Sequence, residues 1–384
     1  MKIDVEKIVK DRYAKGASQK EEALCCPTSY APKLLKVIPQ EILEKDYGCG
    51  DPSKTIREGD IVLDLGSGTG KFCYIASQIV GPKGKAIGID FNPPMLALAR
   101  KHQKAIGERI GYHNVEFRRG RIQDLRTDLD LLEDTLSKKP LKTAEDYFTF
   151  ESYKTKISGE NPLVADESVD IITSNCVLNL VRQEEKELLF KEMHRVLKRG
   201  GRVAISDIVS DEDVPLDLQE DPELWSGCIS GAFREDLFLK AFEEAGFYGV
   251  QIETLEHEPF QTIRGIEFRS VTVTAYKGKE GPCLERNQAV MYKGPWREVL
   301  DDDKHLLKRG ERTAVCDKTY QIFSKAPYRD EVILVPPRKE ISLKKAVPFD
   351  CSRTTVRHPR ETKGEAYRKT TEASSSCCPE EACS

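Results

Sequence analysis

Short apolar runs alternate with longer amphipathic stretches between residues 61 and 207. The apolar runs each contain valine or isoleucine, as strands do, and lie at 61–63, 85–90, 115–117, 169–174 and 202–207. Within 183–198, one helical face carries Leu189, Met193, Val196 and Leu197. Gly200 and Gly201 are expected to end this helix. The alternation of strand and helix predicts an α/β fold with a parallel sheet joined by right-handed crossovers.

The chain is predicted to have five parts. They are an N-terminal arm with thiols (1–60), a cofactor-binding domain (61–207) with an insertion (127–161), a substrate-binding segment (208–280), a small α+β domain (281–350) and a flexible tail with cysteines (351–384). In the arm, two short helices are expected, one marked by Val5, Ile8 and Val9 and one by Leu34, Leu35, Val37 and Ile42. The insertion is charged and poor in periodicity, and we assign it no chemistry.

A glycine-rich turn follows the first predicted strand. It reads Asp64-Leu65-Gly66-Ser67-Gly68-Thr69-Gly70, and such a turn brings a ligand against main-chain N–H groups at a helix N-terminus. The anionic Asp64 would repel a pyrophosphate but attract an ammonium group. Asp90 ends the next strand about twenty residues later, at the spacing of a ribose-binding acid. These features resemble the class I S-adenosylmethionine-dependent methyltransferases, which have a Rossmann-like sheet.

Further cofactor contacts are expected at the carboxyl ends of later strands, where open α/β sheets bind ligands. Ile122 and Gln123 follow the third strand and are candidates for adenine contacts, with Asp124 as a further candidate, although an ordinary loop is the alternative. Asn175 and Cys176 follow the fourth strand. The predicted cofactor-binding residues are therefore Asp64, Gly66, Gly68, Gly70, Asp90, Ile122, Gln123 and Asn175.

Overall charge and composition favour a small substrate. The net charge is −4, so the chain has no basic excess for nucleic acid or an anionic membrane surface. The N-terminal residues are charged throughout, and no apolar run reaches the roughly 18 residues of a membrane span. We therefore expect a cytoplasmic, monomeric protein without nucleic-acid or membrane partners.

Cysteines offer a second chemistry. The chain has 12 of them and no Cys-x-x-Cys pair, which argues against a zinc finger. Cys49, Cys176 and Cys228 each lie in a turn bounded by Gly or Asn, a setting that weighs mildly against buried structural thiols. Three thiolates without a fourth ligand favour a soft ion over zinc. Trivalent arsenic is satisfied by three sulfurs and keeps its lone pair.

The cysteine-bearing motifs make the resemblance more specific. They are YGCG at 47–50, SNCVLNL at 174–180, WSGCISGA at 225–232, RGERTAVCDKTY at 309–320 and the Cys-Cys-x4-Cys ending, beside DLGSGTG at 64–70. Together they resemble the arsenite S-adenosylmethionine methyltransferases. The resemblance implies that Cys49, Cys176 and Cys228 bind arsenic and that Cys25 or Cys26 is a further catalytic thiol. Gln123 departs from the family, which often has an acid there.

The resemblance also implies the reaction. Trivalent arsenic, delivered as a thiol complex, would accept methyl groups stepwise from S-adenosylmethionine to give methylated and dimethylated products. Cys25 or Cys26 would form a disulfide with Cys49, and thioredoxin or glutathione would reduce it. A carbon methyltransferase would share the glycine turn but needs no thiols, and an arsenic-binding storage protein would need no cofactor pocket.

Overall fold

The computed structural model describes residues 4–19, 21, 30–45, 47–364 and 366–367. The chain divides into two compact units, Met1–Gly278 and Lys279–Ser384. Each unit has its own core, and the two are described separately below.

A mixed sheet is the centre of the first unit. Among the described residues it has nine strands, with the order β3-β2-β1-β4-β5-β9-β7, β6 beside β5 and β8 beside β9. The strands are β1 (Ile61–Leu65), β2 (Lys85–Asp90), β3 (Val115–Arg119), β4 (Val169–Asn175), β5 (Leu197–Ser210), β6 (Phe233–Arg234), β7 (Tyr248–Leu255), β8 (Gln261–Ile263) and β9 (Ile266–Tyr276). Strands β1 to β5 run parallel, as the sequence predicted, and β9 is antiparallel to β5 and β7.

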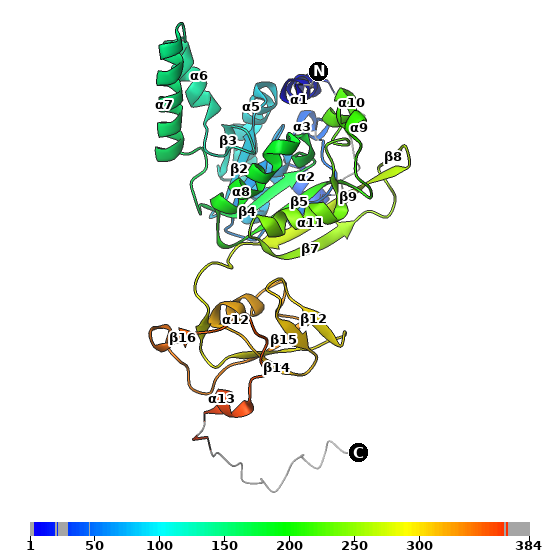
Figure 1. Cartoon of the computed structure of the whole chain (residues 1–384). Helices are drawn as coiled ribbons and strands as arrows, with labels where there is room; N and C mark the ends of the chain where they lie inside the picture. The colour runs from blue at the N-terminus through cyan, green and yellow to red at the C-terminus, as the bar shows by residue number, and fades with distance from the viewer. Residues whose placement is uncertain (1–3, 20, 22–29, 46, 365, 368–384) are drawn as a thin grey trace. The chain divides into compact units, whose positions relative to one another are not determined.

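Helices cover both faces of this sheet (Figure 1). Successive residues of a strand face opposite sides, so Val62 packs with α4 (Lys71–Val80) and α5 (Pro93–Ile110), whereas Leu63 packs with α8 (Lys186–Val196) and α11 (Glu235–Glu244). Helix α8 is shorter than predicted. It ends at Val196, because Leu197 already pairs with Val169 in the sheet. The expectation that Gly200-Gly201 ends the helix was wrong.

Short elements precede and follow the parallel strands. They are α1 (Val5–Ser18), α2 (Pro32–Leu35), α3 (Gln40–Leu43) and η2 (Pro52–Thr55) before β1, and η3 (Leu178–Leu180), η4 (Gln183–Glu185), α9 (Leu216–Gln219) and α10 (Pro222–Ser226) after β4. The second helix expected in the arm is in fact two single turns, because Pro39 is the extended N-cap of α3. Helix α1 packs on α10 through Val5, Val9 and Trp225.

The insertion is a helical hairpin, α6 (Leu129–Lys138) and α7 (Ala144–Glu160), whose two helices lie side by side and stand off from the sheet (Figure 1). The side chain of Thr143 accepts from the backbone N–H of Asp146, and the Asp146 carboxylate accepts in return from Thr143. This capping box explains why α7 begins where it does, although its apolar periodicity is weak. Neither helix buries a side chain fully.

The described part of the second unit is built from short strands and short helical segments. Its elements are β10 (Leu284–Glu285), β11 (Ala289–Tyr292), β12 (Glu298–Leu300), β13 (Leu306–Lys308), β14 (Arg312–Ala314), α12 (Asp317–Phe323), β15 (Val332–Val335), η5 (Leu343–Lys345), β16 (Val347–Pro348) and α13 (Pro359–Lys363). Strands β14, β11 and β15 form a small antiparallel sheet. The α+β composition expected for this region is observed.

The structure differs from the predicted tail boundary at residue 351. Residues beyond it pack into the second unit, because the buried Arg357 pairs with Glu285 at 2.8 Å and also with Glu361. This burial could not be predicted from the polar sequence, because ion pairs and not apolar side chains hold the segment in place. Cys377, Cys378 and Cys383 lie outside the described residues. In the described part of the chain, no helix is both long and apolar enough to cross a membrane.

Candidate functional site: a glycine-loop cavity beside three cysteines

A cavity opens at the carboxyl ends of the parallel strands in the first unit. Its empty space is about 1110 Å³, open solvent at the mouth included. Seven of the predicted cofactor-binding residues line it, namely Asp64, Gly66, Gly68, Asp90, Ile122, Gln123 and Asn175. The eighth, Gly70, is the N-cap of α4. Residues that the sequence predicted to bind the cofactor therefore lie around one cavity.

Close packing explains two of the loop glycines. A Cβ atom on Gly66 would lie 2.4 Å from Val177, and one on Gly70 would lie 2.5 Å from Phe117. Both glycines also have positive φ, which side-chain-bearing residues avoid. Nothing lies within 4 Å of the corresponding position on Gly68, so the middle of the loop is open to a ligand.

Two buried carboxylates flank the loop. The Asp90 oxygens accept from the N–H groups of Gly68 and Asn92, each at 2.8 Å. Burial raises the pKa of the Asp90 carboxyl, and these N–H groups oppose that shift. Asp64 accepts from the Thr173 hydroxyl at 3.1 Å. A carboxylate has about four acceptor positions, so Asp90 can also receive ribose hydroxyls.

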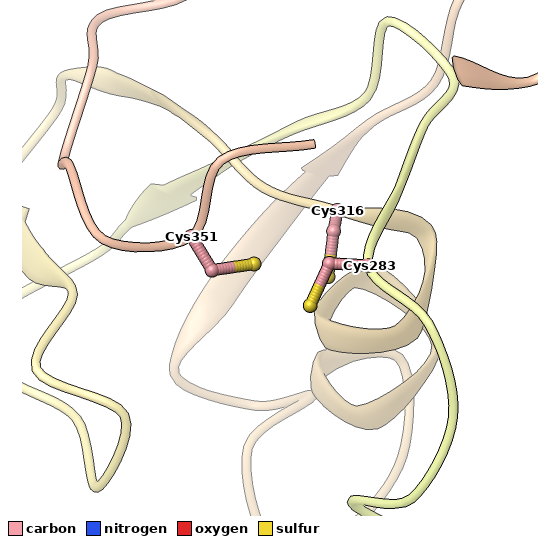
Figure 2. A group of neighbouring side chains, drawn as sticks. All are labelled: Cys283, Cys316 and Cys351. Carbon is pink, nitrogen blue, oxygen red and sulfur yellow. The ribbon is translucent and has the colours of Figure 1, made fainter. Parts of the chain in front are cut away.

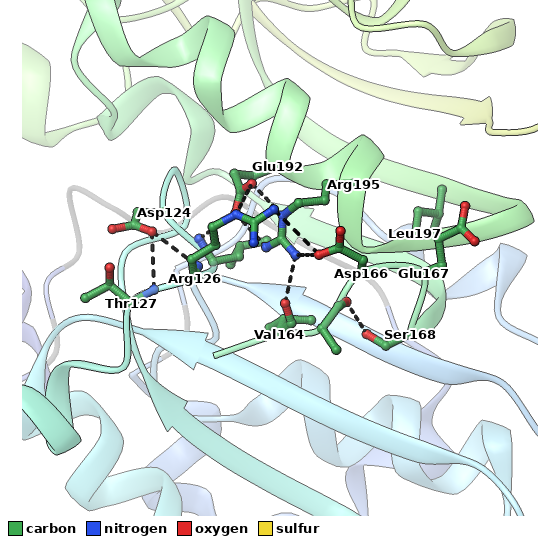
Figure 3. A network of polar contacts seen from close by, with 12 residues as sticks. Asp124, Arg126, Thr127, Val164, Asp166, Glu167, Ser168, Glu192, Arg195 and Leu197 are labelled. Carbon is green, nitrogen blue, oxygen red and sulfur yellow. Dashed lines mark hydrogen bonds and ion pairs between the residues drawn. The ribbon is translucent and has the colours of Figure 1, made fainter. Parts of the chain in front are cut away.

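A network of ion pairs and hydrogen bonds stabilises the loop that carries Ile122 and Gln123. Arg195 reaches Glu192 through two nitrogens, at 2.6 and 2.7 Å, and the carbonyl of Val164 at 3.0 Å, while Glu192 accepts from the N–H of Leu125 (Figure 3). Asp124 accepts from two backbone N–H groups of the following turn. This network fixes the loop, and Gln123 itself donates to Glu185 at 3.0 Å.

Asn175 joins the N-terminal arm to the end of β4. Its Oδ1 accepts from the N–H groups of Cys49 (2.7 Å) and Gly50 (3.1 Å). Its Nδ2 donates to the carbonyl of Gly50 (2.7 Å) and to the hydroxyl of Tyr30 (3.0 Å). Although Asn175 lines the cavity, its amide already makes four hydrogen bonds to the arm. These bonds position Cys49, and the predicted contact of Asn175 with the cofactor stays a prediction.

Cys49, Cys176 and Cys228 come together in one buried cluster. They are exposed by only 6%, 7% and 4%, so the mild argument from their turn settings against burial was wrong. The flanking glycines instead allow close approach, because a Cβ on Gly48 would lie 2.6 Å from Asn175 and one on Gly50 would lie 2.5 Å from Ser206. The arm thus brings its thiol into contact with the sheet.

Two of these cysteines have strained backbones. Cys176 has φ of 59° and Cys228 has φ of 62°, in the left-handed region that residues other than glycine seldom adopt. Such strain concentrates at functional sites, where it aims a side chain. The Cys228 thiol donates to the carbonyl of Cys176 at 2.8 Å, so the two turns face each other.

The structure joins Cys49 to Cys176 by a disulfide, with 5.9 Å between their Cα atoms. The disulfide that the sequence resemblance implied links Cys49 to Cys25 or Cys26 instead. Both of those residues lie outside the described residues. The observed pair differs from that expectation because β4 and the arm place Cys176 directly against Cys49.

Several site residues were not foreseen from the sequence. The hydroxyls of Ser67 and Thr69 are buried in the cavity wall, and no hydrogen-bond partner for them exists among the described residues. Buried orphan hydroxyls suit a polar ligand such as the expected cofactor. Tyr13 of α1 also lines the cavity, and its hydroxyl lies 3.8 Å from the sulfur of Cys228. The stripe Val5, Val9, Tyr13 at spacing i, i+4, i+8 was the available signal.

A buried lysine and aspartate lie in the same region. Burial lowers the pKa of Lys186 to about 7, against the opposing effects of Asp207 and Cys228. Burial likewise raises the pKa of Asp207 to about 6. Asp207 accepts from the N–H of Leu178 at 2.8 Å, and Lys186 donates to the carbonyl of Gly231. Asp207 thus holds the turn after Cys176, and Lys186 holds the turn after Cys228.

Two family models match the chain. Residues 56–246 match a family described as "Methyltransferase domain". Residues 279–367 match a family described as "Domain of unknown function (DUF8838)". The first match includes strands β1 to β6 and the glycine loop, and the second begins at the first residue of the second unit.

Arsenite methyltransferases are similar to this chain in sequence over most of its length. An arsenite methyltransferase of Aquipseudomonas alcaligenes is 30% identical over 80% of this chain and 83% of its own length. One of Mus musculus is 30% identical over 80% and 75%. The crystal structure of an arsenic(III) S-adenosylmethionine methyltransferase from Chlamydomonas reinhardtii aligns with a TM-score of 0.55 at 24% identity, covering 87% of this chain and all of that one, and supports the fold. The chain belongs to the arsenite methyltransferase family.

Proposed function

We propose that this protein transfers methyl groups from S-adenosylmethionine to trivalent arsenic held by the thiolates of Cys49, Cys176 and Cys228. The products are methylated and dimethylated arsenicals. The observation that carries the assignment is the meeting of three buried cysteines with a cavity lined by the glycine loop and Asp90. Their sulfur donors suit a soft ion, and the cavity suits a nucleoside.

Methyl transfer to arsenic needs alignment rather than acid–base catalysis. The sulfonium activates the methyl group, so the arsenic lone pair can displace the sulfur in line, forming an arsenic–carbon bond as the sulfur–carbon bond breaks. Thioether S-adenosylhomocysteine leaves with the electron pair. The tasks of the protein are to hold arsenic by thiolates and to point the methyl group at it. Cys176 lines the cavity itself, which makes it the ligand nearest to the cofactor.

We propose further that an external thiol reductant, thioredoxin or glutathione, is required. The Cys49–Cys176 disulfide removes two of the three ligands, so arsenic can bind only after the disulfide is reduced. Methyl transfer also raises arsenic formally from the trivalent to the pentavalent state. Two thiols can return it to the trivalent state by forming a disulfide, which the same reductant reopens.

One assay tests the function. The reduced protein is incubated with arsenite, glutathione and labelled S-adenosylmethionine, and labelled methylarsenicals are separated by chromatography. We expect product that depends on both arsenite and reductant, and none in Cys228→Ala, which should still bind S-adenosylmethionine. Arsenite binding without methylation would indicate a storage protein. Label transferred to a quinone or sterol but not to arsenic would indicate a carbon methyltransferase.

A further inference from the structure

A second group of three cysteines lies in the second unit. Cys283 precedes β10, Cys316 is the N-cap of α12, and Cys351 follows β16. Their three sulfur atoms all lie within 4.8 Å of one another. Figure 2 shows the three side chains converging from three separate segments of the chain. Neither the proposed reaction nor the sequence resemblance gives these residues a task.

The backbone holds the three segments together. Strands β10 and β16 pair, and the N–H of Phe349 donates to the carbonyl of Cys283 at 2.9 Å. This pairing brings the chain on either side of the strands, and hence Cys283 and Cys351, to one place. The sulfur of Cys316 accepts from the N–H of Thr319 at 3.4 Å. The cluster therefore belongs to the folded unit and is not an accident of a loose loop.

Access is graded across the cluster. Cys316 is fully buried, whereas Cys283 and Cys351 are partly exposed. An ion can thus enter past the two outer sulfurs and be held against the inner one. None of the three forms a disulfide in the structure. Burial and the two neighbouring thiols raise the pKa of the Cys351 thiol.

Nearby carboxylates are occupied by other partners. Asp317 accepts from Arg286 at 2.6 Å, Glu285 accepts from Arg357 at 2.8 Å, and Asp350 accepts from the hydroxyl of Ser352 at 2.6 Å. Among the described residues, no fourth His, Cys, Asp or Glu ligand atom joins the group. The donor set is sulfur alone and three in number. Hard cations are excluded, and zinc would lack its usual fourth protein ligand.

We infer that Cys283, Cys316 and Cys351 form a second trithiolate site that binds trivalent arsenic, apart from the thiols at the cofactor cavity. The choice of arsenic among soft three-coordinate ions rests on the proposed function. The step is a ligand exchange without oxidation: three arsenic–oxygen bonds of arsenous acid break, three arsenic–sulfur bonds form, and each thiol proton leaves with a hydroxyl as water.

The test uses the full chain with the other reactive thiols removed. Serine replaces Cys25, Cys26, Cys49, Cys176, Cys228, Cys377, Cys378 and Cys383. We expect this reduced protein to retain one arsenic per chain after dialysis against arsenite, measured by elemental analysis. Arsenic X-ray absorption should show three sulfur neighbours and no oxygen. Adding Cys351→Ser should weaken binding by roughly a hundredfold, because one chelating arm is lost.

Matched variants keep the result interpretable. Cys73→Ser, added to the same protein, removes a buried thiol that lies in the other unit and should leave arsenic binding unchanged. Should the protein with eight serines fail to fold, as judged by circular dichroism, the otherwise intact chain carrying Cys283→Ser and Cys351→Ser should bind one arsenic fewer than wild type. An unchanged count would overturn the proposal.

Two further outcomes would also overturn it. One is retention of zinc that arsenite cannot displace, and the other is no arsenic bound by a folded protein with eight serines. The methylation assay on wild-type protein is independent of these measurements. Loss of arsenic binding here with normal methylation would reject only this site, whereas binding here without any methylation by wild type would reject only the proposed reaction.

Discussion

Asn175→Ala tests whether this side chain positions Cys49, as its contacts indicate, or binds the cofactor, as the sequence predicts. The substitution removes four hydrogen bonds to the arm, two to N–H groups, one to a carbonyl and one to a hydroxyl. At 0.5–1.5 kcal/mol each, the loss is about 2–6 kcal/mol, and bonds from one amide do not add fully. The Ser270 hydroxyl still donates to the carbonyl of Cys49 at 2.7 Å, so part of the attachment remains. We take about 3 kcal/mol as the expected cost.

The substitution should weaken arsenite binding and leave S-adenosylmethionine binding unchanged. If Cys49 is released from the sheet, arsenite affinity should drop by roughly a hundredfold, since each 1.4 kcal/mol is about tenfold. Titration of the reduced protein with arsenite, and separately with S-adenosylmethionine by calorimetry, measures both. Asn161→Ala, at the exposed end of α7, is the control. A large loss of cofactor affinity with unchanged arsenite affinity would refute the positioning role and make Asn175 a cofactor ligand.

Three other substitutions test other parts of the site. Asp90→Ala should weaken S-adenosylmethionine binding by about 1.5–3 kcal/mol for each lost ribose contact, with arsenite binding retained; calorimetry against the exposed Asp134→Ala checks this. Cys49→Ser should abolish methylation of arsenite but retain that of supplied methylarsenite, which exchanges only two ligands; product analysis decides. Burial lowers the pKa of Lys186 from 10.5 to about 7. Between these two pH values the lysine is protonated in the unfolded chain but neutral in the folded protein. The free energy of unfolding should therefore rise with pH over this range, by about 5 kcal/mol at most, and urea titrations should show no such rise in Lys186→Met.

The sheet and its glycine loop were predictable because their signals are local. A run of apolar residues followed by Gly66 and Gly68 describes both a strand and the positive φ angles that must follow it. Asp90 could be placed because it ends the adjacent parallel strand, and Asp64 and Gly88 are register partners in that pair. Positions along parallel strands are tied to sequence by the pairing itself.

The insertion and the tail boundary show where local signals fail. Helix α7 begins at the Thr143–Asp146 capping box, yet its apolar periodicity is too weak to reveal a helix of its length. Arg357 is buried and pairs with Glu285, which is far away in the chain. A polar segment held by ion pairs has the same composition as a disordered tail. Only the residues with which it pairs show that it is folded.

The sequence was enough to name the three cysteines of the cluster but not to predict that they are buried together. The reason lies in the N-terminal arm. Turn residues on both sides of Cys49 suggested mobility, but Gly48 and Gly50 are small because Asn175 and Ser206 lie against them. No pattern near residue 49 contains that information, since the contacts belong to strands more than a hundred positions later. The amide of Asn175 then holds the arm at the carboxyl end of β4. A ligand-bearing segment with little regular structure is thus positioned by one side chain on a rigid strand, which is why we expect that side chain to control arsenic affinity.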